Sequence, residues 1–350
     1  MKEMTSAERV FTSISFKEPD RVPLFLCLSF YGAKELGMSI KEYYSNYENV
    51  VVAQIKMKEK YNNDCYNSFF YASLEIEAFG GGTIFREDGP PNAKEPIIKK
   101  LEDIDNLEVP DVKFSKPLEQ VFEVQKRLKE KSLGSVPIVG IIISPFSLPI
   151  MQMGFDKYLE LIYFHSDYFW KLMNKNMTFS ISWANMQLKA GADVIVYFDP
   201  MLSTEMLPKD IILKTGYKIA KKTLSLINGP VAIHLASAKT EGIVEDLIKT
   251  KAIALGISKN DNLKFLKSKT YGKISIIGNL DTISMRKWSY KEVEENVKKA
   301  IFEGAKGGGF ILSDNHGEIP WQVNEEILFL IAEAVRKYGQ YPIREESYYG

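Results

Sequence analysis

The chain has 350 residues, a length that suits one large α/β domain or two smaller domains. Its 45 lysine and arginine residues balance its 45 aspartate and glutamate residues, and the sequence pI is about 6.9. Because this balance gives no overall field that would attract nucleic acid or an anionic membrane, we predict neither as a partner.

Two features point to a reducing compartment. Cys27 and Cys65 are the only cysteines, too few for a disulfide framework or a cysteine-based zinc finger. Residues 1–5 lack the apolar core of a signal peptide. The longest apolar stretch, residues 136–153, is interrupted by prolines and falls short of a membrane span of about 20 residues. We therefore predict a cytoplasmic protein.

The N-terminal part, residues 1–62, is predicted to be mainly helical. The first helix begins at Thr5 or Ser6, where either hydroxyl can cap it and Glu8 favours the positive helix end. A strand is expected at 22–28, followed by helical sequence through Tyr61. Residues 80–100 are rich in glycine and proline, which indicates loop or short strand.

Beyond residue 117, apolar strand-like runs alternate with helical stretches. The runs cover 137–143, 193–198, 229–234, 252–257, 273–278 and 309–313, and the helical stretches cover 156–190, 208–227, 240–249, 290–303 and 323–338. Continuous apolar strands that alternate with helices are typical of a parallel sheet covered by helices. With earlier strands at 22–28 and 65–70 the count reaches about eight, which favours a (β/α)8 barrel over an open sheet. We predict one domain, 1–350, with a tail at 340–350.

Reactive side chains follow several of these strands. Asp199 comes after the 193–198 run, His234 ends the next, Asn279 and Asp281 follow 273–278, and His316 follows 309–313. The C-terminal ends of barrel strands meet at one mouth, so we expect these groups to share a site.

Segments along nearly the whole chain resemble the uroporphyrinogen decarboxylase superfamily, and within it the corrinoid-dependent methyltransferase branch. The matching segments are Ala7-Glu8-Arg9-Val10, residues 17–23, 74–80 and 87–91, Ser144-Pro145-Phe146-Ser147-Leu148, residues 190–193, Phe198-Asp199-Pro200, Gly278-Asn279-Leu280-Asp281 and residues 308–312. The resemblance implies a (β/α)8 barrel whose active site lies at the C-terminal mouth.

Departures from the decarboxylase pattern argue against that activity. The decarboxylases bind substrate carboxylates with an arginine-rich segment after the first strand, whereas this chain has Cys27-Leu28-Ser29 there, without arginine. A substrate with many carboxylates needs fixed cations, for which arginine is the best partner. Uroporphyrinogen decarboxylation is therefore the weaker alternative.

Departures from the thiol-methylating branch point to another methyl donor. That branch holds zinc with His-x-Cys after one strand and a cysteine after the last, and here the positions read His234-Leu235-Ala236 and His316. Nitrogen and oxygen ligands make zinc a stronger Lewis acid, which suits an oxygen leaving group. We predict methyl transfer from an O-methylated small molecule, such as an aryl methyl ether, to cob(I)alamin. The chain has no Asp-x-His-x-x-Gly signature, so the cobalamin must come on a separate corrinoid protein.

The resemblance and the strand ends together give a candidate site. Predicted zinc ligands are His234, His316, Asp281 and, as a weaker choice, Glu318. Predicted catalytic or orienting groups are Asp199, Glu77 and Asn279. Predicted substrate contacts are Asn315 and the aromatic residues Tyr71, Phe30 and Tyr31.

Structural roles remain open for the same residues. The histidines can serve as hydrogen-bonding core residues, Asp199 and Asp281 as caps, Glu77 as part of a solvated helix face, and the aromatic residues as core. Two further functions also stay open: a methylcobalamin:thiol methyltransferase with an altered zinc site, and a non-catalytic corrinoid or tetrapyrrole binder. His165, inside an expected helix, is predicted to be structural.

Overall fold

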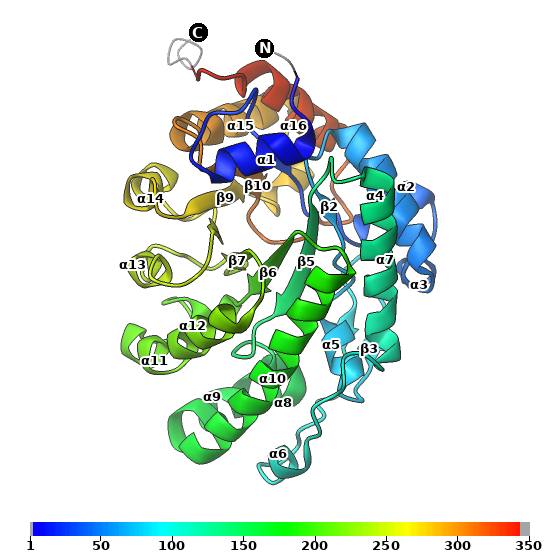
Figure 1. The fold of residues 1–350 in the computed structure, drawn as a ribbon, viewed down its shortest axis with the longest axis vertical. Helices are drawn as coiled ribbons and strands as arrows, with labels where there is room; N and C mark the ends of the chain where they lie inside the picture. Colours follow the sequence, from blue (N-terminus) through cyan, green and yellow to red (C-terminus); the bar gives the residue numbers. More distant parts are fainter. Residues whose placement is uncertain (1–2, 344–350) are drawn as a thin grey trace.

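A parallel sheet of eight strands forms the centre of the protein (Figure 1), which we describe from a computed structural model covering residues 3–343. The strand order is β1-β10-β9-β8-β7-β6-β5-β2. The strands are β1 (Leu24–Phe25), β2 (Tyr66–Asn67), β5 (Ile138–Ile143), β6 (Val194–Phe198), β7 (Val231–His234), β8 (Ala254–Gly256), β9 (Ser275–Leu280) and β10 (Phe310–Asp314). A short antiparallel hairpin, β3 (Thr83–Ile84) and β4 (Asn92–Ala93), lies apart from this sheet.

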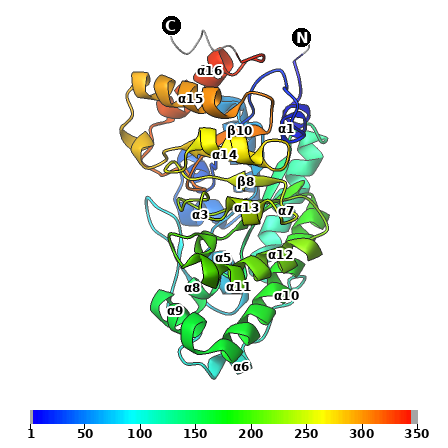
Figure 2. The same cartoon turned by 90° about the vertical axis from the view of Figure 1, so that its left-hand side faces the viewer.

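Helices surround the sheet, as Figures 1 and 2 show. They are α1 (Ser6–Ile14), α2 (Tyr31–Leu36), α3 (Ile40–Tyr44), α4 (Tyr47–Tyr61), α5 (Ser73–Ala78), α6 (Asp103–Asn106), α7 (Lys116–Ser132), α8 (Pro149–Met153), α9 (Phe155–Phe164), α10 (Ser166–Ala190), α11 (Lys209–Lys214), α12 (Gly216–Leu226), α13 (Val244–Leu247), α14 (Leu263–Thr270), α15 (Tyr290–Gly304) and α16 (Glu325–Tyr338), with 3-10 turns at Pro200–Leu202 and Ser284–Lys287. The predicted (β/α)8 barrel is thus confirmed.

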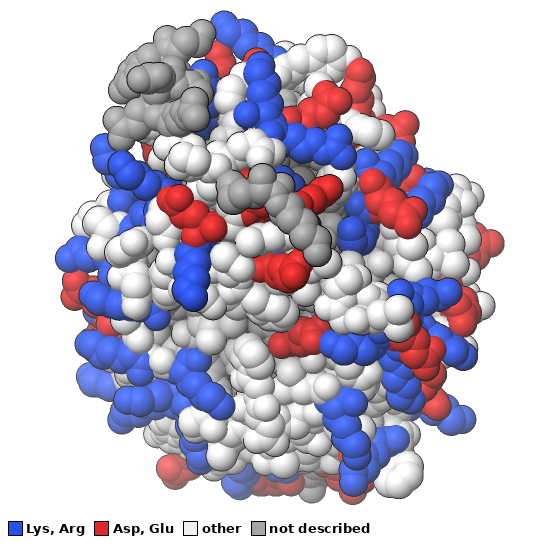
Figure 3. Space-filling model, turned by 45° about the horizontal axis from the view of Figure 1, so that its top comes forward, with Lys and Arg blue, Asp and Glu red and all other residues white. Residues whose placement is uncertain are grey.

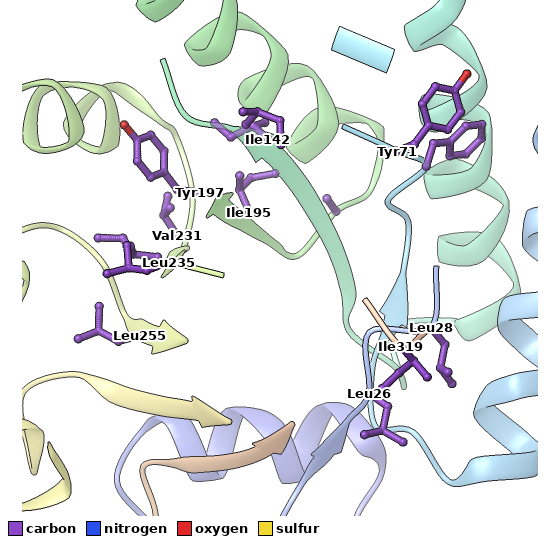
Figure 4. Packing of buried hydrophobic residues seen from close by; sticks show 14 of the residues in the cluster. Leu26, Leu28, Tyr71, Ile142, Ile195, Tyr197, Val231, Leu235, Leu255 and Ile319 are labelled. Atoms are coloured by element: carbon purple, nitrogen blue, oxygen red, sulfur yellow. The ribbon is translucent and has the colours of Figure 1, made fainter. Parts of the chain in front are cut away.

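The strands have this position because they are apolar on both faces. All six residues of β5 are buried, one face towards the barrel interior and the other towards the helices. Figure 4 shows part of this packing, with Leu26 and Leu28 after β1 lying beside Ile319. The backbone N–H of Ile319 donates to the carbonyl of Cys27 at 3.1 Å, so the chain after β10 is fixed against the chain after β1.

Side chains help to join the two end strands of the sheet. The N–H of Asp64 donates to the carbonyl of Leu24 at 2.7 Å, and Asp64 Oδ2 accepts from the Leu24 N–H at 2.9 Å. One residue earlier, Asn63 accepts from the Leu26 N–H and donates to the Leu26 carbonyl. These bonds connect β1 to the segment before β2, where no regular strand ladder forms between the two.

Helix α1 is held beneath the barrel by buried ion pairs. Thr5 and Glu8 form a capping box at its start, as the sequence suggested. Arg9 on α1 pairs with Asp20 at 2.7 Å and with Asp64 at 2.6 Å, and Arg21 pairs with Asp64 at 2.7 Å. The segments 7–10 and 17–23, which carried part of the family resemblance, therefore form a clamp that we call the lower clamp: Arg9, Asp20, Arg21 and Asp64.

Two glycines let α1 approach β10. Gly308 and Gly309 both have positive φ, and a Cβ on Gly308 would lie 2.3 Å from the Lys17 carbonyl oxygen. The N–H of Gly309 donates to the Ser13 carbonyl at 2.6 Å. The glycine run before β10 is thus required by the contact with α1.

Some boundaries differ from the sequence predictions. Residues 1–62 are mainly helical, as predicted, and β1 and α4 within them belong to the barrel. His165 is not inside a helix: it separates α9 from α10 and lies 3.7 Å from Glu160. The predicted 340–350 tail lies outside the described residues from 344 onward.

The surface carries both signs of charge. On the face shown in Figure 3, basic and acidic side chains are interspersed. Between residues 3 and 343, no helix combines the length and the apolarity that a membrane span requires.

Candidate active site

A pocket of about 300 Å³ lies at the C-terminal ends of the strands. Its walls are mainly apolar: Phe25, Phe69, Tyr71, Ala72, Pro90, Pro91, Ile141, Ile143, Val196, Phe198, Ala232, Ile233, Ala236 and Ile277. The other lining residues are Cys27, Asn92, His234, Gly256, Ser313, His316, Gly317 and Glu318. No lysine or arginine is among these described lining residues. This is the size and composition of a small-molecule site.

His234, the last residue of β7, is a buried ionisable group of the pocket. Its ring stacks on Phe198 with centroids 5.6 Å apart, and a Cβ on Gly256 would lie 2.2 Å from its Cδ2, so only glycine there leaves room for this ring position. Burial lowers the pKa of His234 to about 4, further lowered by His316 and partly offset by Asp314. The imidazole is therefore neutral at pH 7.

The hydrogen bonds of His234 indicate its tautomer. Its Nδ1 accepts from the backbone N–H of Ala236 at 3.0 Å. A neutral imidazole that accepts at Nδ1 carries its proton on Nε2. His234 thus offers an N–H donor rather than a free lone pair at Nε2.

His316 lies on the exposed side of the same pocket. Its Nδ1 shares a hydrogen bond of 2.7 Å with Ser237 Oγ, which ties the loop after β10 to the loop after β7. The two strand-end histidines therefore do line one pocket, although they come from strands far apart in the sequence.

Glu318 supplies a carboxyl group to the pocket. Its Oε1 accepts from Ser29 Oγ at 2.7 Å. Burial raises the pKa of Glu318 to about 7; the Ser29 bond opposes this shift and the nearby Asp314 adds to it. The carboxyl group is therefore partly protonated at neutral pH.

Two groups that were not among the predicted site residues also shape the pocket. Asp314 is fully buried, accepts from the Cys27 N–H and the Gly317 N–H at 2.8 Å each, and so fixes the turn that carries His316. Cys27 lines the pocket, and burial raises the pKa of its thiol well above the usual range, so the sulfur stays protonated. The position of Cys27 near the end of the first strand was the available signal.

The residues present do not fit the predicted zinc site as they are arranged. Within residues 3–343, no group of three or more His, Cys, Asp and Glu side chains is placed to hold a metal ion. His234 accepts at Nδ1, which leaves Nε2 protonated, and Cys27 is a thiol. The chemistry of this pocket is therefore derived from its side chains.

Asp281, the fourth predicted ligand, does not line the pocket. It pairs with Lys259, accepts from Ser284 Oγ, and accepts the backbone N–H groups of Ile283 and Ser284 at 3.2 Å. These contacts lower its pKa against the effect of partial burial. The prediction that Asp281 is a zinc ligand is therefore corrected. Its side chain caps the turn that follows β9, which is the structural role left open for it from the sequence.

Two predicted amides are used in loop contacts. Asn279 Nδ2 donates to the Ser258 carbonyl at 3.0 Å. Asn315 Oδ1 accepts from the N–H of Thr282 at 3.1 Å and from its hydroxyl at 3.0 Å. Neither amide lines the pocket. Both instead join strand-end loops to each other.

The aromatic predictions divide into two groups. Tyr71 lines the pocket, together with Phe69. Phe30 and Tyr31 do not: they begin α2, are almost fully buried, and the Tyr31 hydroxyl donates to the Val323 carbonyl at 3.0 Å. For Phe30 and Tyr31 the pocket prediction is therefore corrected to core packing.

The remaining predicted acids lie behind the pocket wall. Glu77 accepts from the Tyr71 hydroxyl at 3.4 Å without lining the pocket itself. Asp199 is fully buried and accepts from Ser147 Oγ at 2.6 Å, and burial raises its pKa to about 7. Glu75, which was not predicted, accepts from the Ile143 N–H and from Trp183, and burial raises its pKa to about 8.

The family model for uroporphyrinogen decarboxylase matches residues 5–338. The chain belongs to the uroporphyrinogen decarboxylase family. Its match covers every strand of the barrel and the whole pocket, which confirms the resemblance drawn from the sequence segments.

Relatives in this family include two kinds of enzyme. The chain is 25% identical over 342 residues to a uroporphyrinogen decarboxylase of Protochlamydia amoebophila, covering 94% of this chain and 92% of the relative. It is 23% identical over 314 residues to a methylcobamide:CoM methyltransferase of Methanosarcina mazei, covering 87% and 91%.

Solved structures share the architecture. A methyltransferase from Methanosarcina mazei superposes with a TM-score of 0.86 at 19% identity, covering 96% of this chain and 99% of that one. A B12-independent methionine synthase from Shewanella sp. W3-18-1 gives a TM-score of 0.53 at 15% identity, covering 85% and 89%. At these identities the likeness concerns the fold.

Proposed function

We propose that this family member is a corrinoid-dependent methyltransferase. It would move a methyl group from a small O-methylated molecule, such as an aryl methyl ether, to cob(I)alamin carried by a separate corrinoid protein in the cytoplasm. The similarity to the methylcobamide:CoM methyltransferase over most of the chain supports the reaction class. The observation that carries the choice of donor is the apolar pocket without lysine or arginine among its lining residues.

The pocket disfavours the two activities named for the relatives. Uroporphyrinogen carries many carboxylates, and a thiol such as coenzyme M carries a sulfonate, so both call for fixed cations. Ionised groups buried without partners are strongly disfavoured. An uncharged ether meets no such penalty against Phe69, Phe198 and Ile277.

The polar side of the pocket offers the chemistry that ether cleavage needs. When the methyl group passes to the corrinoid acceptor, the carbon–oxygen bond of the ether would break and its electron pair would move to the oxygen. Hydrogen-bond donors held at that oxygen stabilise the developing charge. The Nε2–H of His234 and the Glu318 carboxyl are two donors that line the pocket.

A reconstituted methyl-transfer assay tests the proposal. The purified chain is incubated with cob(I)alamin and anisole, and the conversion of cob(I)alamin to methylcobalamin is followed by absorbance. We expect conversion that depends on the enzyme and releases phenol. Stepwise loss of carboxylates from uroporphyrinogen, with no methylcobalamin formed from any ether, would contradict the proposal and support the decarboxylase alternative.

Metal analysis addresses the zinc prediction separately. The arrangement of His234, His316 and Glu318 leads us to expect no stoichiometric zinc in the purified chain and unchanged methyl transfer after dialysis against a chelator. Zinc at one equivalent that disappears in a His234→Ala variant would restore the zinc mechanism.

A further inference from the structure

The pocket has an apolar floor, and its polar lining groups lie nearer the mouth. Phe25, Val196, Ala232 and Ile277 line both this pocket and a smaller cavity of about 50 Å³ beneath it, so these four side chains form the partition between the two. Every one of them is apolar. We call this set the floor.

Polar lining groups first appear one step nearer the mouth. Side chains two residues apart on a barrel strand point to the same side, one layer higher. Two residues beyond Phe25, Val196 and Ala232 are Cys27, Phe198 and His234, and all three line the pocket. This layer is therefore mixed, and His234 is its polar group. Ser313, His316 and Glu318, on and after β10, supply the other polar groups of this side.

The apolar floor and the polar groups nearer the mouth together determine the orientation of a bound ligand. We propose, on the basis of the proposed function, that the donor is an uncharged single-ring aryl methyl ether that binds with its ring on the floor, its ether oxygen beside His234, and its methyl group towards the mouth. The ring position opposite the ether oxygen then contacts the floor. A carboxylate at that position would be buried among Phe25, Val196 and Ile277 with no partner.

The orientation also meets a requirement of the chemistry. A corrinoid on another protein reaches the methyl group only from the mouth of the barrel. A donor with its methyl group on the floor would place the oxygen and the ring between that methyl group and the cobalt. We call this arrangement, with the ring on the floor and the methyl group towards the mouth, the ring-first orientation. It places the ring against apolar side chains and leaves the methyl group accessible to the acceptor.

A matched pair of ligands tests this inference by binding alone. Isothermal titration calorimetry would compare 4-methoxytoluene with 4-methoxybenzoate, which differ at the position opposite the ether by a methyl group and a carboxylate. We expect the neutral ligand to bind at least about tenfold more tightly. Equal or tighter binding of the benzoate, or no binding of 4-methoxytoluene, would overturn the proposal.

A matched pair of variants tests which side chains form the floor. Ala232→Val raises the floor beneath the ring, whereas Ala254→Val on the neighbouring strand adds the same atoms beside the lower cavity, outside the pocket. We expect Ala232→Val to weaken 4-methoxytoluene about tenfold and anisole much less, with Ala254→Val changing neither. Thermal denaturation would show that both variants are folded.

Equal effects of the two variants, or equal effects of Ala232→Val on both ligands, would contradict the ring-first orientation. Because these measurements report binding, they separate this inference from the proposed function. If the binding pattern holds but no methylcobalamin forms, the reaction proposal fails while the ligand orientation stands.

Discussion

The two ends of the barrel treat buried charge in opposite ways. At the bottom, the lower clamp pairs Asp20 and Asp64 with Arg9 and Arg21 at 2.6–2.7 Å. At the mouth, His234 and Glu318 have shifted pKa values because burial outweighs the opposing effects of Asp314 on His234 and of Ser29 on Glu318. At the bottom, charged groups stabilise the fold through ion pairs. At the mouth, ionisable groups with shifted pKa values line the pocket where a ligand can contact them.

Breaking the lower clamp should have the largest effect on stability. Asp64→Ala leaves Arg9 and Arg21 without a shared carboxylate and removes the bond to the Leu24 N–H. We expect the free energy of unfolding to fall by about 3–5 kcal/mol, measured by urea denaturation. Methyl transfer per folded molecule should be unchanged.

Asp210→Ala is the control for this variant, since Asp210 forms an exposed pair with Lys214. A loss of stability as small as that of the control would show that the clamp does not hold the barrel closed.

Replacing His234 at the mouth should have the opposite effect to Asp64→Ala: it should reduce methyl transfer and leave the chain folded. His234→Ala removes the proposed donor to the ether oxygen, and we expect methyl transfer to fall by about 10² with the chain still folded. The transfer rate at saturating donor, beside the urea midpoint, measures both effects. If His234→Ala unfolds the chain as Asp64→Ala does, or leaves the rate intact, the contrast between the two ends is lost.

Gly308, at the bottom of the barrel, gives a second test of how this end contributes to stability. Gly308→Ala forces a side chain into positive φ and towards the Lys17 carbonyl. We expect a loss of at least about 2 kcal/mol in urea denaturation, because positive φ alone costs a substituted residue about that much. The Gly89→Ala variant is the control, as nothing lies within 4 Å of a Cβ there.

A pH series should show the cost of the unpaired acid behind the pocket. Glu75 has its pKa raised from 4.5 to about 8 by burial, so the folded state holds its proton more tightly than the unfolded chain. Its contribution to stability is complete below pH 4.5 and is lost as pH rises to about 8.

Glu75→Gln has no proton to lose at that position. The stability of the natural chain relative to this variant should therefore decline by up to ~1.4 kcal/mol per pH unit between pH 4.5 and 8. Asp199 and Glu318 titrate in both proteins, so their effects cancel in the difference. Parallel stability curves would show that Glu75 is ionised in the folded protein at neutral pH.

The sequence predicted the barrel well because its signal is local. Apolar runs at 137–143 and 309–313 lie within a residue or two of β5 and β10, and burial on both strand faces leaves that pattern little freedom. The same strand ends led to His234 and His316, which do line one pocket.

The remaining site residues were harder to predict. The end of a strand indicates that a residue lies near the mouth, but it does not indicate which residues its side chain contacts. Asp281 stands close to a strand end yet pairs with Lys259, a residue from another loop. Phe30 and Tyr31 follow β1 but turn into α2 and the core. The role of Asp314, which holds the turn before His316, depends on the backbone of Cys27, nearly 300 residues earlier in the chain.

The most direct test of the account is methyl transfer from 4-methoxytoluene to cob(I)alamin by the purified chain. We predict enzyme-dependent formation of methylcobalamin with release of 4-methylphenol, and a much slower reaction with 4-methoxybenzoate. No methylcobalamin from either ether, together with decarboxylation of uroporphyrinogen, would contradict the account.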